Sequence, residues 1–237
     1  MHGNMNIDST KQKKINIFDS KKNRVRNLLF IIIPIFIVMC VFGVIAGLSV
    51  SNLLSSASSG GTATHANEIE GKNIFLRKNA TNLQKDLFAQ LKQAYADGND
   101  EEAAKLTAES FIADFYTWTN KYGSYDVGGI YYCCDRYNTE LYGRDTFYKY
   151  VSYYIDKYGS ENLLEVTSIN AEGGLIPNAK YILEYDGQEY EQYYFTVDWE
   201  YADHPGFTEK EYCSRNYIVV IKSSAGRFEI VEAYGDN

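Results

Sequence analysis

Histidine is scarce in this chain of 237 residues, which contains three histidines. His2 and His65 lie in polar segments near the N-terminus, so His204, in a loop with proline and glycine, is the single histidine of the predicted folded domain. Ser/His/Asp and Cys/His sites need a histidine next to the nucleophile, and nothing else in the sequence points to His204. The sequence therefore gives little support to nucleophilic catalysis.

Cysteine is also sparse and lacks the spacing of a metal centre. Cys133 and Cys134 are adjacent, and Cys213 lies far downstream. Zinc sites draw on spaced pairs of cysteine and histidine, and two adjacent cysteines rarely ligate the same tetrahedral ion. We therefore predict neither a metal nor a cofactor.

Charged residues are missing from one long segment, residues 28–50, which reads LLFIIIPIFIVMCVFGVIAGLSV. About 20 apolar residues are enough to cross a bilayer core as a helix. A cleaved signal peptide would have an apolar region of only about 7–15 residues after a short basic start, whereas residues 1–27 form a long polar segment. We therefore predict one transmembrane helix over residues 28–50.

Lysine and arginine are absent between residue 51 and Lys72 but frequent in residues 1–27. Because positively charged flanks stay in the cytoplasm, we predict that residues 1–27 are a basic cytoplasmic head and that the chain beyond residue 50 is extracytoplasmic. This is the layout of a single-pass protein of a bacterial cell membrane. Acidic residues outnumber basic ones beyond the membrane, which argues against nucleic-acid binding, because that binding depends on cations that displace counterions from phosphates.

The chain after the apolar segment divides into a linker and one domain. Residues 51–74 are mostly small and polar, a composition typical of a flexible linker. Residues 75–237 have the size of one domain with a single core. We predict that they form an extracytoplasmic α+β domain.

Helical spacing of apolar residues predicts three helices before residue 160. Helices commonly begin after a capping Ser, Thr, Asp or Asn and end at a glycine. The expected boundaries are Thr81 or Asn82 and Gly98 for the first helix, Asp100 for the start of the second, and Asp145 and Gly159 for the third. The Gly- and Tyr-rich segment between the second and third helices is expected to be a loop.

From Leu163 onward the apolar residues alternate with a period of two, which indicates strands. We predict a strand over residues 163–172, a hairpin over residues 179–201 that turns at Asp186-Gly187, and a closing hairpin over residues 216–234. Alternate residues of the segment 193–201 are aromatic or aliphatic, so one sheet face is expected to be buried. Helices followed by a curved antiparallel sheet predict an α+β fold with helices on one face.

The extracytoplasmic location bears on the three cysteines of the domain. Disulfides form in such oxidising compartments, so a bond from Cys133 or Cys134 to Cys213 is the favoured interpretation, and the sequence does not choose between the first two. A bond between the adjacent cysteines, or three reduced and packed thiols, remain as alternatives. The odd count leaves at least one thiol unpaired within a monomer.

Tyrosine is unusually common, and all 22 tyrosines follow residue 94. Its apolar ring and polar tip suit a wet cleft, an interface or a small core. The candidates for a cleft or interface are Tyr131, Tyr132, Tyr150, Tyr154, Tyr193 and Trp199. Nearby carboxylates at Asp126, Asp135 and Asp198 could act as a general base, but so acidic a domain offers such groups anywhere.

The order of the elements resembles a known fold. A helical AAKLTAESFIADFYTWTNKYG, then DVGGIYY, then a Tyr-rich helix and a bent antiparallel sheet resemble the cone-shaped nuclear transport factor 2-like fold. With the basic head and the transmembrane helix, the whole chain is similar in layout to the bitopic assembly factors of type IV secretion systems and their conjugation relatives. The resemblance covers the architecture and carries no motif-matched residues.

The resemblance implies a scaffold, not an enzyme, that forms homo-oligomers and contacts other secretion-channel proteins outside the membrane. An extracytoplasmic module that binds a small molecule or a cell-wall fragment is the alternative. A third reading is an isomerase- or dehydratase-like activity in the cavity of the cone, because this fold also hosts enzymes. An open pocket with a buried carboxylate beside a tyrosine hydroxyl would favour the enzyme, and an interior filled by side chains would favour the scaffold.

Overall fold

The structure, a computed structural model, describes residues 67–203 and 212–235. The predicted head, the predicted transmembrane segment at residues 28–50, most of the predicted linker and His204 lie outside these residues. Among the described residues, no helix has both the length and the apolar character needed to cross a membrane. The membrane topology and the domain boundaries therefore stay predictions.

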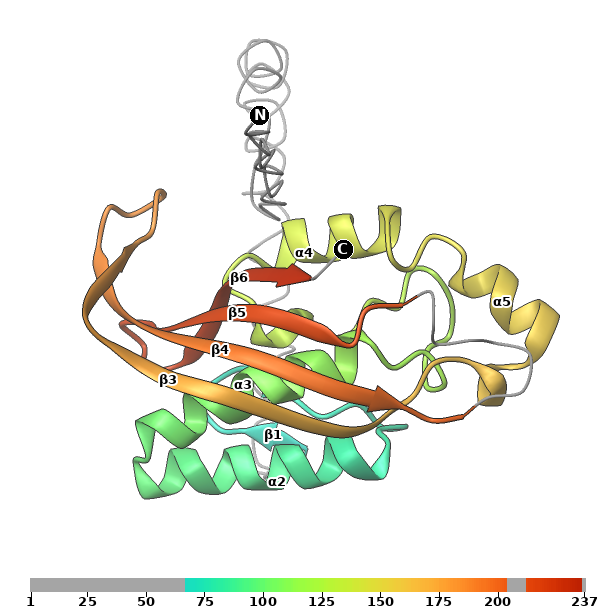
Figure 1. Ribbon diagram of the computed structural model, residues 1–237, viewed down its shortest axis with the longest axis horizontal. Helices are drawn as coiled ribbons and strands as arrows, with labels where there is room; N and C mark the ends of the chain where they lie inside the picture. The colour runs from blue at the N-terminus through green and yellow to red at the C-terminus, as the bar shows by residue number, and fades with distance from the viewer. Residues whose placement is uncertain (1–66, 204–211, 236–237) are drawn as a thin grey trace, which may run out of the picture. The chain divides into compact units, whose positions relative to one another are not determined.

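The described chain is an antiparallel sheet with helices on one face (Figure 1). The strand order β3-β4-β5-β6 follows the sequence, helix α3 packs against the sheet, and α2 packs on α3. The elements are β1 Glu68–Ile69, β2 Ile74–Phe75, α2 Asn82–Asp97, α3 Asp100–Phe115, η1 Ile130–Tyr132, α4 Arg136–Asp145, α5 Val151–Tyr158, η2 Ser160–Asn162, β3 Val166–Ile182, β4 Glu189–Tyr201, β5 Arg215–Lys222 and β6 Phe228–Gly235. The prediction of an α+β fold with helices packed on an antiparallel sheet is confirmed.

Local capping explains the boundaries of the first two long helices. Thr81 caps α2 through a capping box with Gln84, and Gly98 ends the helix in the left-handed conformation, as predicted. The cap of α3 is Asn99, whose side chain accepts a hydrogen bond from the Glu102 amide, so the prediction of Asp100 as the cap is wrong by one residue. Asp100 is instead the first helical residue, where a negative charge favours the helix dipole.

The segment between α3 and the sheet contains more helix than predicted. Arg136–Asp145 is helix α4, capped by Asp135, so Asp145 ends a helix and does not begin one. Helix α4 contains a glycine, Gly143, at a position where a larger residue would not fit. A Cβ there would lie 2.7 Å from Val127 Cγ1. The glycine is therefore explained by tertiary packing. The Gly- and Tyr-rich composition of this segment instead predicts a loop. Helix α5 ends at Gly159, as predicted.

Strand β3 is one long strand where two were predicted. Its register with β4 shifts between Leu175 and Lys180, where Pro177 has no amide proton for the ladder and Asn178 has a φ of 63°. The connection to β4 also differs from the predicted two-residue turn, because the Gly187 amide donates to the Leu183 carbonyl across a longer loop. The long hairpin therefore bends but stays paired on both sides of the irregularity (Figure 1).

The inner face of the sheet follows the predicted alternation. Tyr193, Phe195, Val197 and Trp199 of β4 are buried, and their neighbours in sequence are more exposed. The closing hairpin of β5 and β6 turns as predicted, with Gly226 in the left-handed conformation. Apolar residues on the helices and on this face form one continuous core.

Candidate functional site

Aromatic side chains fill the space between α3 and the inner face of the sheet. The Tyr116 and Trp199 ring centroids lie 4.6 Å apart, and those of Trp118 and Phe147 lie 4.8 Å apart. Phe147 also stacks on Phe115 at 5.3 Å. Two pockets of the described part of the chain lie away from this aromatic interior, and neither is lined by a residue of strands β3 to β6. The candidate site therefore lies on the other side of α3, where β2 and the loop before α4 meet it.

Four charged side chains form a cluster at this site, and three of them, Arg77, Asp114 and Asp126, line its larger pocket. The buried Lys121 ammonium lies 2.8 Å from Asp114 Oδ1. The Arg77 guanidinium lies 3.3 Å from the same carboxylate oxygen and 2.6 Å from Asp126 Oδ1. Two basic and two acidic groups thus neutralise one another within the cluster.

Burial and charge act in opposite directions on Asp114 and Lys121. Burial favours the neutral form of Asp114, but Lys121, Arg77 and the Gly129 amide outweigh it, and the net pKa of this carboxyl is lowered. Burial lowers the pKa of Lys121 to about 8, although Asp114 acts against this effect. At neutral pH both groups are therefore charged and held by each other.

Two glycines of the DVGGIYY motif allow the loop to approach α3 closely. The Gly129 amide donates to Asp114 Oδ2 at 2.8 Å, and Gly129 has a φ of 75°. A Cβ on Gly128 would lie 2.1 Å from the Asp114 carbonyl oxygen. The Tyr148 hydroxyl accepts from the Gly128 amide and donates to the Phe115 carbonyl. The motif is thus a close backbone crossing, which only glycine permits at these two positions.

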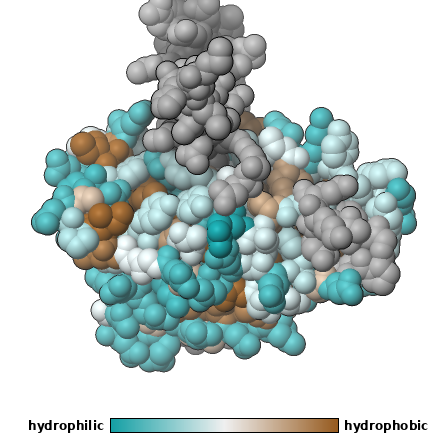
Figure 2. All heavy atoms as spheres, in the orientation of Figure 1, coloured by the Kyte–Doolittle hydropathy of each residue, from teal (hydrophilic) through white to brown (hydrophobic). Residues whose placement is uncertain are grey.

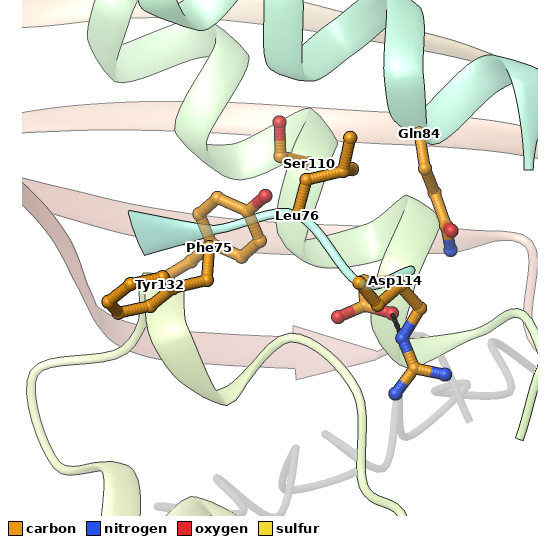
Figure 3. Close-up of a pocket in the computed structure, with 7 residues that line it drawn as sticks. Phe75, Leu76, Gln84, Ser110, Asp114 and Tyr132 are labelled. Carbon is orange, nitrogen blue, oxygen red and sulfur yellow. Dashed lines mark ion pairs between the residues drawn. The ribbon is translucent and has the colours of Figure 1, made fainter. Parts of the chain in front are cut away.

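A small cavity lies beside the Asp114 carboxylate (Figure 3). Its lining residues are Phe75, Leu76, Arg77, Gln84, Ser110, Asp114 and Tyr132. The volume is about 10 Å³, which is room for one water molecule. This cavity is too small for an organic ligand.

A larger groove opens over the same ionic cluster. Its volume is about 370 Å³, within the range of small-ligand sites. The aromatic residues of its lining are Phe75, Tyr125 and Tyr131. We call it the Phe75–Tyr131 groove. Its full lining is Phe75, Leu76, Arg77, Lys78, Asp114, Tyr125, Asp126, Val127, Ile130, Tyr131 and Glu140.

Exposed tyrosines continue from this groove toward α5. Ser124 and Ser152 hydrogen-bond to each other, which holds the loop of Tyr122 and Tyr125 against α5. Tyr153 of α5 is exposed as well. The exposed tyrosines of this region are Tyr122, Tyr125, Tyr150 and Tyr153, and we call them the tyrosine surface. Figure 2 shows strongly hydrophobic residues in separate patches on the side of the β3–β4 hairpin. Leu175, Ile176 and Ile182 of β3 are exposed aliphatic residues.

The six aromatic residues proposed from the sequence for a cleft or an interface lie in different surroundings. Tyr193 packs against Phe228, and Trp199 packs against Tyr116, both within the core. Tyr154 lies on α5, and its ring adjoins that of Tyr150, which precedes the helix. Of the six, Tyr131 lines the groove and Tyr132 the small cavity beneath it. Period-two alternation indicates burial correctly, but it does not show which buried rings face a common space.

The three carboxylates considered as general bases all have structural partners. Asp126 pairs with Arg77, Asp135 caps α4, and Asp198 pairs with Arg215 on the sheet. The sequence does not single out Asp114 and its fully buried partner Lys121, which form the centre of the ionic cluster. Among the described residues there is no group of three or more His, Cys, Asp or Glu side chains arranged to hold a metal ion.

The favoured disulfide is not formed in this fold. Cys133 pairs with Ile230 of β6, whereas Cys213 lies beside Gly235, farther along the same strand. The two positions on β6 are roughly 15 Å apart at the usual rise of a strand, and a disulfide requires Cα atoms within about 7 Å. Burial raises the pKa of Cys133 to about 12 and that of Cys134 to about 11. No disulfide joins the described cysteines, in line with the alternative of reduced thiols.

No protein-family model, curated protein or solved structure matches this chain. Function is therefore inferred from the geometry of the groove, the ionic cluster and the tyrosine surface.

Proposed function

We propose that this chain is a membrane-anchored extracytoplasmic scaffold subunit, acting by protein–protein contacts in a type IV secretion or conjugative transfer apparatus. We also propose that its extracytoplasmic domain has the cone-shaped nuclear transport factor 2-like fold. The observation that carries the scaffold role is the contrast between a packed aromatic interior and an exposed tyrosine surface. Tyrosine is enriched at protein interfaces because its ring adds buried area and its hydroxyl tolerates water.

The ionic cluster also supports a binding role over a catalytic one. Asp114, Lys121, Arg77 and Asp126 are engaged with one another. A general base must reach a substrate proton with a carboxylate or amine that is available to accept it. In this cluster the charges instead hold β2, α3 and the DVGG loop together.

The sequence supports the proposed location and the proposed apparatus. The uncharged segment at residues 28–50 and the basic residues before it predict an anchor with the domain outside. The four-stranded antiparallel meander with helices on one face agrees with the element order of the resemblance. Homo-oligomers and channel proteins are the partners this proposal requires.

Site-specific photocrosslinking in the native membrane tests the proposal. In one variant a benzophenone amino acid replaces Tyr153, which belongs to the tyrosine surface and is 56% exposed. In a control variant it replaces Tyr185, which lies on the β3–β4 loop and is 76% exposed. We expect adducts with a second copy or with subunits of the secretion channel from position 153, and few from position 185. Adducts with neither class of protein from either position would contradict the scaffold role.

A second function is favoured by one observation, the volume of the Phe75–Tyr131 groove. A groove of about 370 Å³ with aromatic walls and a few polar groups is also typical of small-molecule sites. The alternative is therefore a module that binds a small molecule or a cell-wall fragment outside the membrane. Titration of the full chain in nanodiscs with a disaccharide–peptide wall fragment, followed by calorimetry, distinguishes the two roles.

A further inference from the structure

We infer that the Phe75–Tyr131 groove is the docking site for an extended segment of a partner protein, which presents an apolar or aromatic side chain between one acidic and one basic residue. The inference rests on the proposed scaffold function and adds the place and chemistry of one contact. Its basis is the lining of the groove, its charges and its continuity with the tyrosine surface.

The walls offer an aromatic seat for an apolar side chain. Phe75 and Tyr131 are 40% and 38% exposed, and their ring centroids lie 5.4 Å apart in an edge-to-face arrangement. The Arg136 guanidinium stacks on the Tyr131 ring at 5.2 Å and donates to the Asn73 carbonyl, which holds the ring in place. Preordered aromatic rings of this kind commonly dominate binding energy at interfaces.

The charges of the groove divide into a neutral floor and an oppositely charged rim. On the floor, Arg77 pairs with Asp114 and Asp126. At the rim, Lys78 follows β2 and Glu140 lies on α4. Neither rim residue forms an ion pair with another residue of the described segments. The groove therefore complements a segment with one charge of each sign, and not a polyanion or a polycation.

The surroundings favour a polypeptide over a compact small molecule. Tyr125 lines the groove and is also part of the exposed loop that Ser124 and Ser152 hold against α5. A bound segment would therefore leave the groove across the tyrosine surface and gain further contacts there. A small molecule would use the groove alone.

Selection from a phage-displayed library of random heptapeptides tests the inference, with the full chain in nanodiscs as the target. From the parent chain we expect enrichment of peptides with an aromatic or large aliphatic residue between an acidic and a basic residue. From the double variant Lys78→Glu/Glu140→Lys we expect the same apolar residue with the order of the two charges reversed. The reversal is diagnostic because non-specific binding of peptides to the surface would not depend on the order of their charges.

Two controls keep the result specific to the groove. The variant Lys180→Glu/Glu191→Lys swaps an exposed pair on β3 and β4 and should select the parental charge order. Phe75→Ala and Tyr131→Ala, each checked for parental thermal unfolding, should bind the parental peptides about tenfold more weakly, as expected for central aromatic residues of an interface.

The inference is overturned by the absence of an enriched sequence, by the same charge order from the parent and the rim double variant, or by binding that Phe75→Ala leaves unchanged. It is also overturned if the wall fragment binds the parent, loses binding in Phe75→Ala, and no peptide is enriched. These failures differ from failure of the scaffold role, which shows as missing crosslinks from position 153.

Discussion

Two ion pairs of similar length lie in opposite surroundings in this domain. Lys121 and Asp114 are 2.8 Å apart, with side chains that are 0% and 18% exposed. Arg215 and Asp198 are 2.6 Å apart on the sheet, with side chains that are 50% and 44% exposed. Water screens the second pair, whereas a buried charge that loses its partner has no solvent to replace it. Although the two ion pairs have similar N–O distances, removing the carboxylate is therefore expected to cost much more stability in the buried pair than in the exposed one.

The comparison also separates structural charges from those available to a partner. The Asp114 cluster joins α3 to the β2–α2 connection and to the DVGG loop. It thereby fixes the position of the groove above it. The charges that a partner meets are at the rim and on the sheet, where side chains keep contact with water.

The largest expected effect is that of Asp114→Asn. The substitution keeps the shape of the side chain but leaves the Lys121 ammonium without its nearest counter-charge in a buried site. We expect the free energy of unfolding to fall by about 3–5 kcal/mol, as for other broken buried pairs. Urea unfolding followed by circular dichroism measures it. A loss below 1 kcal/mol, as for a surface pair, would show that water reaches the cluster.

A smaller loss is expected from Tyr148→Phe. The Tyr148 hydroxyl donates to the Phe115 carbonyl at 2.6 Å and accepts from the Gly128 amide at 3.1 Å. Its removal leaves two buried backbone groups without a partner, at a cost of about 1–3 kcal/mol. The control is Tyr122→Phe at an exposed position, which should change stability by less than about 0.5 kcal/mol. Equal effects from the two variants in urea unfolding would contradict the assigned hydrogen bonds.

The pH dependence of stability should carry the signature of Lys121. The unfolded chain holds the Lys121 proton up to a pH of about 10.4, whereas the folded chain releases it at about 8. Between these values the unfolded state binds more protons, so the stability of the parent rises with pH relative to Lys121→Met, by about 1–2 kcal/mol from pH 7 to 9.5.

Urea unfolding of both proteins at each pH measures this difference. The thiols of Cys133 and Cys134 have raised pKa values in the folded state, so they lower stability over the same range, but they do so in both proteins and cancel. A difference between parent and variant that is constant with pH would show that Lys121 keeps an ordinary pKa in the fold.

The smallest effect is expected from Asp198→Asn. Arg215 loses the Asp198 carboxylate but stays half exposed, so water can solvate the side of its guanidinium that faced Asp198. The free energy of unfolding should change by less than about 1 kcal/mol, and high salt should reduce even that. Parallel urea titrations at low and high salt give the measurement. A loss as large as that of Asp114→Asn would remove the distinction between the two pairs.

Local signals in the sequence predicted much of the fold. Thr81 and Gly98 mark α2 because capping and left-handed glycine are properties of a few adjacent residues. The alternation of Tyr193 to Trp199 marks the buried face of β4 for the same reason. Prediction failed where a distant contact decided the outcome, as at Gly143, which packs against Val127 inside a helix.

The candidate site was predicted only in part. The sequence offers Tyr131 as a cleft or interface residue, and it lines the groove, and the DVGG motif marks the loop that contacts Asp114. Asp114 and Lys121 were missed because a carboxylate in a helix and a lysine in a loop look like ordinary solvated charges. Asp114 also accepts a hydrogen bond from the Gly129 amide and pairs with Arg77, and no local pattern reports that these distant segments cross α3 at this point.

The sequence by itself determined the helix caps, the alternating strands and the α+β order of elements, since these follow from residues close together in the chain. Only the tertiary structure decided which charges are buried together, which tyrosines remain exposed and how far Cys213 lies from Cys133. The physical reason is that desolvation and packing depend on neighbours in space. Arg77, for example, joins the Asp114–Lys121 pair from the segment between β2 and α2, and Cys133 lies beside Ile230 of β6.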